Sequence, residues 1–75
     1  MGVHMVIRKA DEAEELAQQY LQNRYSVTGN IITTSVGFDG NFFTISGYWE
    51  EGETRFDFEV KADKDGNIVG WRVTP

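Results

Sequence analysis

The sequence predicts an α+β fold in which one N-terminal helix packs on a curved four-stranded antiparallel meander, with strand order 1-2-3-4. Two observations lead to this prediction. A helical apolar period occupies the first third of the chain. The rest consists of runs rich in β-branched and aromatic residues, separated by the dipeptides Asp39-Gly40, Glu51-Gly52 and Asp65-Gly66. Dipeptides of this kind between alternating apolar residues are strong hairpin signals.

The helix is expected over Asp11–Arg24. One stripe of residues follows the i, i+3, i+4, i+7 spacing of an amphipathic helix: Ala13, Leu16, Ala17, Tyr20, Leu21 and Arg24. Asp11 can act as the N-cap, and Glu14 three residues later would complete a capping box. Glutamates in the first turn match the positive end of the helix dipole.

Four strands are expected over Ile31–Phe38, Phe42–Glu50, Thr54–Ala62 and Ile68–Thr74. We treat each dipeptide as a two-residue type I′ loop, which fixes the register of the whole sheet. Under this assumption the residues flanking each loop face one another: Phe38 with Asn41, Glu50 with Glu53, and Lys64 with Asn67.

This register gathers the apolar residues on one face of the sheet. The expected inward rows are Val36, Phe43, Val60 and Trp71; then Thr34, Ile45, Phe58 and Val73; then Ile32, Gly47 and Phe56; and, toward the other end, Ala62 and Val69. Trp49 also points inward, and Gly47 is expected to leave room for the ring of Phe56 or Tyr20. A slip of one residue would turn a strand's apolar set outward.

The opposite face is expected to be polar. It carries Thr33, Ser35, Thr44, Ser46, Arg55, Asp57, Glu59, Lys61, Arg72 and Thr74, together with the aromatic residues Phe42 and Tyr48. Glu59 would lie opposite Arg72, and Tyr48 opposite Arg55, which are favourable cross-strand pairs. Phe42 and Tyr48 are therefore candidate binding aromatics on the outer face.

Length and composition exclude several classes of protein. Seventy-five residues form one domain. We interpret residues 1–4 as an added leader and residues 5–75 as the α+β domain. The leader contains the single histidine, His4. Without cysteine there is no disulfide or thiolate site. The net charge of −5 argues against a nucleic-acid partner. No signal peptide or membrane-length apolar run occurs, so no membrane partner is expected, and the compartment stays open.

No catalytic, metal or cofactor site is expected, and the protein is not expected to be an enzyme. The serines and threonines lie on strands without a usable histidine. Asp57 and Glu59 have predicted partners in Arg72 and hydroxyl groups, unlike a desolvated catalytic pair. The stretch DKDGN, Asp63–Asn67, begins like a calcium loop, but its glycine comes fourth instead of sixth and Thr74 occupies the position of the required glutamate.

The stretch FEVKADKDGNIVGW, Phe58–Trp71, resembles the closing hairpin of PepSY-type domains, and the resemblance extends to the helix at Asp11–Arg24. It implies a non-catalytic, often extracytoplasmic module that contacts or restrains a protein partner. None of that family's functional residues maps onto this sequence. A helix wrapped by a curved meander is also similar to cystatin-like folds, although no inhibitory loop motif is present.

The first strand is the candidate interaction site, because it lies at the sheet edge and carries neither charge nor proline. Its candidate residues are Ile31, Thr33, Ser35 and Gly37. Three occupants of this edge remain open: the chain's own Met5–Ile7, a second copy, or a partner peptide.

The expected function is that of a small non-enzymatic module that binds a protein or peptide strand, or itself, at a sheet edge. The alternative is an engineered, consensus or orphan scaffold with no evolved biochemical activity. Capping, helical period, turn residues and register all agree with one another, which favours this alternative because natural sites tend to break such a rule.

Overall fold

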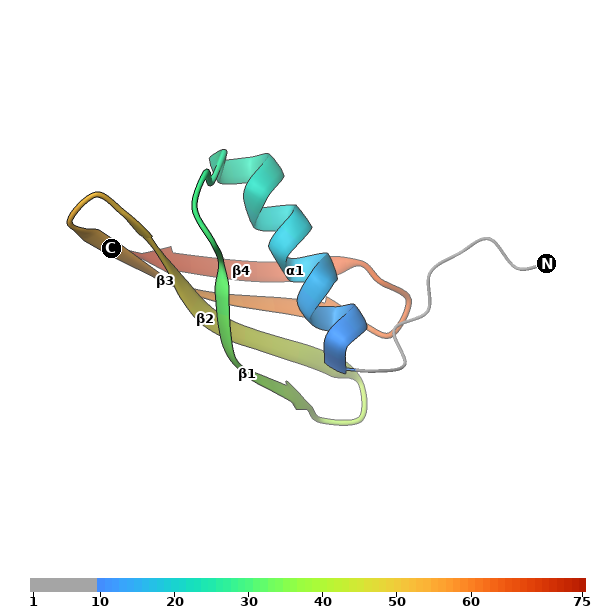
Figure 1. Cartoon of the computed structure of the whole chain (residues 1–75). Coiled ribbons are helices and arrows are strands. Elements are labelled where there is room, and N and C mark those ends of the chain that lie inside the picture. Colours follow the sequence, from blue (N-terminus) through green and yellow to red (C-terminus); the bar gives the residue numbers. More distant parts are fainter. Residues whose placement is uncertain (1–9) are drawn as a thin grey trace.

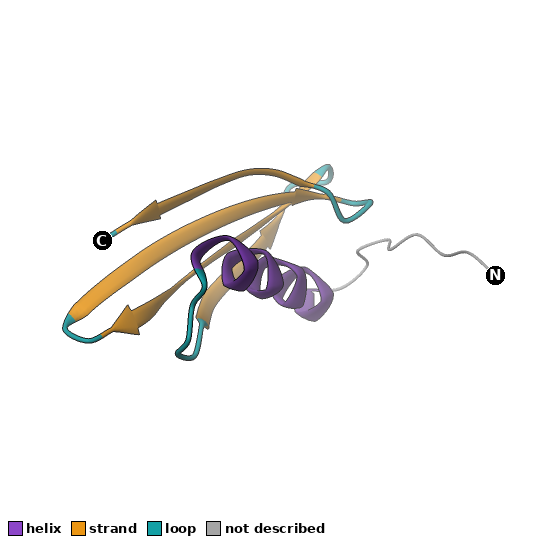
Figure 2. Ribbon diagram, turned by 90° about the horizontal axis from the view of Figure 1, so that it is seen from above, coloured by secondary structure: helices purple, strands orange, loops and turns teal. Residues whose placement is uncertain are grey.

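The computed structural model describes residues 10–75 as one helix and one sheet. The elements are α1 (Ala10–Tyr25), β1 (Ile32–Phe38), β2 (Phe42–Glu51), β3 (Thr54–Asp63) and β4 (Ile68–Thr74). The strands pair antiparallel in the order β1-β2-β3-β4, which confirms the predicted fold class. The helix lies across one face of the sheet (Figure 1), and the strands curve around it when seen from above (Figure 2).

The expected leader, His4 and the segment Met5–Ile7 lie outside the described residues. Within residues 10–75, no helix is both long enough and apolar enough to cross a membrane.

The helix packs through small residues. Ala13, Ala17 and Leu21 are fully buried, as the stripe predicts. The N-cap prediction is wrong, because α1 already includes Ala10 and so Asp11 lies inside the first turn. The Asp11 carboxylate instead accepts the N–H of Glu12 at 3.1 Å.

The chain leaves the helix through a left-handed residue. Ser26 has φ +54°, and its N–H donates to the carbonyl of Gln22 at 2.9 Å. This is a common way for a helix to end, although glycine is the residue that usually fills the position.

Strand β2 lies two residues away from its predicted register. The observed row is Val36, Ile45, Val60 and Trp71, with Ile45 where Phe43 was expected. In this row β1, β3 and β4 keep their predicted alignment with one another. The displacement of β2 by two residues therefore explains why both the β1–β2 and the β2–β3 pairings differ from the prediction. Because side chains alternate every two residues, β2 still presents the same residues to the helix.

Turn chemistry explains the displacement. The first two hairpin loops are Gly40-Asn41 and Gly52-Glu53, each flanked by a residue pair. Positive φ occurs at Gly40 (100°) and Gly52 (62°), and not at Asp39 or Glu51. A type I′ loop over Asp39-Gly40 would force positive φ on an aspartate, whereas a type II′ loop requires it only at the first residue, which is glycine.

The third hairpin keeps its predicted register over most of its length. Val60 pairs with Trp71, and Glu59 with Arg72. Near the turn, however, Ala62 pairs with Ile68 instead of Val69, so the prediction for Val69 is wrong: it is an extra, exposed residue in β4.

The loop of this hairpin has three residues, 64–66. Asp63 donates its N–H to the carbonyl of Asn67 at 2.9 Å, and Gly66 has φ +88°. A glycine in this conformation typically ends a three-residue hairpin loop and introduces a bulge.

A bulge also interrupts β1. Thr33 pairs with Gly47 and Ser35 with Ser46, so Thr34 is an extra residue. The alternation reverses there, and Ile32 pairs with Tyr48 on the outer face with 42% exposure.

The predicted inward positions of Ile32 and Thr34, and the outward position of Thr33, are therefore wrong. Thr34 is exposed, and its hydroxyl donates to the carbonyl of Ser46 at 3.2 Å. Thr33 is half-buried, and its hydroxyl oxygen accepts from the Gln18 amide of the helix at 3.4 Å.

Gly47 of β2 lies directly opposite this bulge. A Cβ at Gly47 would collide with the carbonyl oxygen of Ile32 and come within 2.8 Å of the Phe58 ring. The missing side chain therefore makes room for backbone of β1 and for Phe58, and not for Phe56 or Tyr20 as expected.

The core lies between α1 and the inner face of the sheet. The predicted inward residues Phe43, Ile45, Phe58, Val60 and Ala62 are buried. Trp49 is 2% exposed and stacks on Phe56 with ring centroids 5.3 Å apart.

Trp71 does not join this core. It faces the helix side but remains 41% exposed, because α1 packs mainly on β1, β2 and β3. Its ring contacts Tyr20 edge-on at 5.3 Å, the Arg24 guanidinium lies 4.3 Å from its centroid, and its Nε1 donates to the Tyr25 hydroxyl at 3.0 Å. The prediction of a buried Trp71 is wrong.

Candidate functional site: the free edge of β1

The two outer-face aromatics lie where they were predicted, but a cation covers each of them. The Lys61 ammonium lies 5.0 Å from the Phe42 ring centroid. The Arg55 guanidinium lies 3.9 Å from the Tyr48 centroid, although the residue directly opposite Tyr48 is Asp57. Both rings are half-buried, so they offer a ligand little free aromatic surface.

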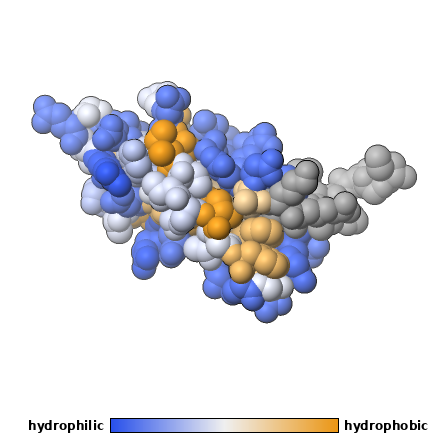
Figure 3. Space-filling view, turned by 60° about the horizontal axis from the view of Figure 1, so that its bottom comes forward, coloured by the Kyte–Doolittle hydropathy of each residue, from blue (hydrophilic) through white to orange (hydrophobic). Residues whose placement is uncertain are grey.

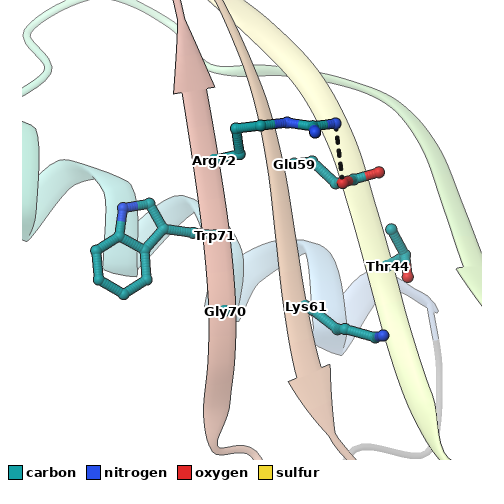
Figure 4. Close-up of a pocket in the computed structure, with 6 residues that line it drawn as sticks. All are labelled: Thr44, Glu59, Lys61, Gly70, Trp71 and Arg72. Carbon is teal, nitrogen blue, oxygen red and sulfur yellow. Dashed lines mark hydrogen bonds and ion pairs between the residues drawn. The ribbon is translucent and has the colours of Figure 1, made fainter.

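A hollow of about 320 Å³ lies on the same outer face. Its lining residues are Thr44, Glu59, Lys61, Gly70, Trp71 and Arg72. Gly70 has no side chain to fill the hollow, and the Trp71 side chain points to the opposite side of the sheet (Figure 4). Arg72 and Glu59 form an ion pair at 3.3 Å across the hollow, with 73% and 48% of their side chains exposed. Charges this well solvated provide neither a desolvated acid nor a desolvated base.

The free edge of β1 has a different character. The strand Ile32–Phe38 contains no charged residue and no proline, and among residues 10–75 it has a neighbouring strand on one side only. Ile32 and Phe38 are 42% and 52% exposed. Figure 3 brings the β1 side of the molecule forward and shows apolar side chains at the surface among polar ones.

The four predicted edge residues do not form one continuous site. Ile31 precedes β1 and is buried, and its carbonyl accepts from the Gln18 amide at 3.3 Å. Thr33 turns toward the helix at the bulge. Only Ser35 and Gly37 are exposed on the outer face.

The bulge divides the edge into two parts. Residues before it are held to the helix by Gln18. Residues after it, Ser35–Phe38, pair regularly with β2 and form a short straight edge, which we call the regular edge segment. Bulges commonly protect edges from unwanted pairing, so this segment is the part of β1 open to another strand.

The opposite edge, β4, is less suited to strand addition. It carries the charged Arg72 on its outer side and its own bulge at Val69. On its inner side, Trp71 is held by the helix residues Tyr20, Arg24 and Tyr25. Sequence reasoning missed this aromatic cluster, although the four-residue spacing of Tyr20 and Arg24 already placed them on one helix face.

Asp39 closes the regular edge segment. Its Oδ1 accepts the N–H groups of Asn41 at 2.9 Å and Phe42 at 2.8 Å, and these hydrogen bonds lower the pKa of Asp39 below its usual 3.8. Asp63 plays the same part in the third hairpin. Its pKa is also lowered, chiefly by hydrogen bonds from the backbone and side chain of Asn67.

These pKa shifts predict acid sensitivity. A carboxyl whose pKa is depressed in the folded state adds stability above its unfolded pKa, near 3.8, and loses it as pH falls through the lower folded pKa. The unchanged chain should therefore lose more unfolding free energy between about pH 6 and about pH 2 than the double variant Asp39→Asn/Asp63→Asn, which has no charge to lose there. Urea titrations at both pH values measure the difference. Equal losses in the two proteins would contradict the role assigned to these carboxylates.

Within residues 10–75, no cluster of three or more metal-ligating side chains is present. Comparison with family models, curated proteins and solved structures gives no match to this chain. The PepSY-type and cystatin-like resemblances therefore stay predictions, and the functional argument rests on the geometry of the β1 edge.

Proposed function

We propose that the protein is a small non-enzymatic module that acts by pairing the free edge of β1 with another strand, from a peptide, a protein or a second copy. The observation that carries this proposal is the regular edge segment, which is uncharged and unbulged and ends in the exposed ring of Phe38. Unpaired N–H and C=O groups on such an edge are satisfied by an added strand, and neighbouring side chains supply specificity. The resemblance to PepSY-type modules points in the same direction, toward a protein partner.

One observation favours a second candidate, a scaffold without biochemical activity. Both edge strands carry a bulge, at Thr34 and at Val69, and bulges are a usual protection against edge-to-edge pairing. Under this candidate the regular edge segment is too short to hold a partner, and the chain remains monomeric.

A lysine on the edge distinguishes the two candidates. Gly37→Lys places a charge on the exposed outer face of the regular edge segment, at a position where a Cβ meets no atom within 4 Å, so it should keep the fold and weaken any association. Thr33 is unsuitable for a lysine because it faces the helix. Thr74→Lys adds the same charge at the exposed end of β4 and serves as the control.

Sedimentation equilibrium of the unchanged chain and both variants gives the answer. The proposal predicts association that Gly37→Lys weakens at least tenfold and Thr74→Lys leaves nearly unchanged. Because each lysine reduces the net negative charge by one, charge repulsion alone would make both variants associate more strongly. A monomer at millimolar concentration that also captures no strand-forming peptide would leave the scaffold candidate standing.

A further inference from the structure

We infer that the strand added to β1 is β1 of a second copy, paired antiparallel across a two-fold axis at Gly37. The two four-stranded sheets would then join into one sheet of eight strands. This inference rests on the proposed edge function and specifies its partner and its register.

Charge restricts where a second copy can bind. The chain carries a net charge of −5, so two copies repel one another over most of their surfaces. The residues of β1 contribute nothing to this repulsion, because none of them is charged. β4 also carries no acidic residue, but its Arg72 and bulge make it the poorer edge. Identical edges pair readily because a two-fold interface brings the same patch of both subunits together.

Symmetry limits the possible registers. In a two-fold antiparallel pair the axis stands perpendicular to the sheet, and one residue lies opposite its own copy. An axis at Ser35 or Val36 would draw the bulged residue Thr34 into the pairing, opposite Val36 or Phe38 of the second copy. An axis at Phe38 would pair little more than the residues at the start of the turn.

An axis at Gly37 avoids both problems. It leaves the bulge outside the paired segment and places Val36 opposite Phe38 of the second copy, twice by symmetry. Both residues lie on the helix side of the sheet, where Val36 is half-buried and Phe38 is exposed. The Phe38 ring already packs on Phe43 with centroids 4.5 Å apart, so the pairing extends this apolar row into the second copy.

The ends and the centre of the paired segment also fit. Asp39 would lie opposite Ser35 of the second copy, so each carboxylate meets a hydroxyl donor, and the two carboxylates lie at opposite ends of the segment. At the axis, a Cβ on residue 37 would meet no atom within 4 Å, and the φ of Gly37 is not positive, so a side chain can be introduced there without strain in the monomer.

Disulfide trapping tests this register, since the chain contains no cysteine of its own. Opposite Cα atoms in an antiparallel pair are about 4.5–5.5 Å apart, within the range that a disulfide bridges. Gly37→Cys should therefore form a covalent dimer in an oxidised-glutathione buffer, where two thiols lose two protons and two electrons to the glutathione disulfide. Ser35→Cys is the matched control, because the two copies of residue 35 would lie about 14 Å apart, four residues along the strand.

The inference predicts that Gly37→Cys cross-links at least tenfold faster than Ser35→Cys, and that Phe38→Ala weakens the dimer measured by sedimentation. Thermal melts of the reduced variants verify that each is folded.

Equal cross-linking rates, faster cross-linking of Ser35→Cys, or an unchanged dimer in Phe38→Ala would overturn the register. If Gly37→Lys still weakens a dimer in that case, the edge function stands and only the register fails. If the unchanged chain is monomeric and neither cysteine variant cross-links above a random rate, this inference fails, and peptide capture decides whether the edge function survives.

Discussion

Replacing Gly47 with alanine is expected to unfold the domain or to lower its unfolding free energy by about 3 kcal/mol or more, the upper end of what overpacking costs. The new methyl group would meet the carbonyl oxygen of Ile32, which belongs to the backbone of the β1 bulge and cannot rotate away. It would also lie 2.8 Å from the Phe58 ring, which is buried and has little room to move. For a domain with a total stability of roughly 5–10 kcal/mol, such a loss leaves little folded protein at elevated temperature.

Two other strand glycines provide matched controls for this change. A methyl group on Gly37 or Gly70 would have no atom within 4 Å, and neither glycine has positive φ. Gly37→Ala and Gly70→Ala should therefore stay within about 1 kcal/mol of the unchanged chain, with any gain coming from the lower entropy of the unfolded state. Circular dichroism melts of dilute samples compare the three. If Gly47→Ala has the same melting temperature as its controls, the β1 backbone does not pack closely against Gly47 of β2.

The second large effect is expected at Trp49. Trp49→Ala removes a ring that is 2% exposed and packs on Phe56 and Phe58, which should cost about 3–5 kcal/mol. The same substitution at Trp71 removes a ring that is 41% exposed and lies outside the main core, so Trp71→Ala should cost clearly less.

Urea denaturation followed by circular dichroism measures both changes without relying on tryptophan fluorescence. Glu59→Ala, on the exposed outer face, provides a baseline close to the unchanged chain, because an exposed ion pair contributes little. Equal losses for Trp49→Ala and Trp71→Ala would contradict the position of α1 over β1, β2 and β3.

The two faces of the sheet could be predicted from sequence, whereas the register of β2 could not. Phe43, Ile45 and Trp49 point inward in either register, because a displacement of two residues preserves the alternation. The choice between registers depended on which loop residue adopts positive φ. A type I′ loop at Asp39-Gly40 requires positive φ at both residues, whereas in the structure Gly40 has positive φ and Asp39 does not.

The β1 bulge had no recognisable signal in the sequence. Thr33, Thr34 and Ser35 are all acceptable strand residues on either face, so the pattern did not indicate which of them is the extra one. Gly47 was the nearest clue, since an interior strand glycine often marks a bulge or a close approach of backbone. Its partner across the strands, however, could only be identified in three dimensions.

The candidate site was predicted in part. The position of β1 at the edge of the described sheet follows from the meander and is confirmed, and so is the outward-facing position of Ser35. Gly37, whose exposure was not predicted, is exposed as well. Ile31 and Thr33 were misplaced because their positions depend on Gln18, which reaches from the helix to both of them. The alternation of apolar and polar residues predicts which face of the sheet a strand residue occupies. It does not predict a hydrogen bond from a side chain of another element, such as Gln18 of the helix.

The most direct test of self-association through the β1 edge is a dilution series of the unchanged chain followed by backbone amide NMR. Self-association through β1 predicts that the amide resonances of Ser35–Phe38 shift with protein concentration, while those of β4 around Val69–Trp71 stay fixed. Shifts centred on β4, or no concentration dependence at any amide up to millimolar protein, would contradict self-association through the free edge of β1.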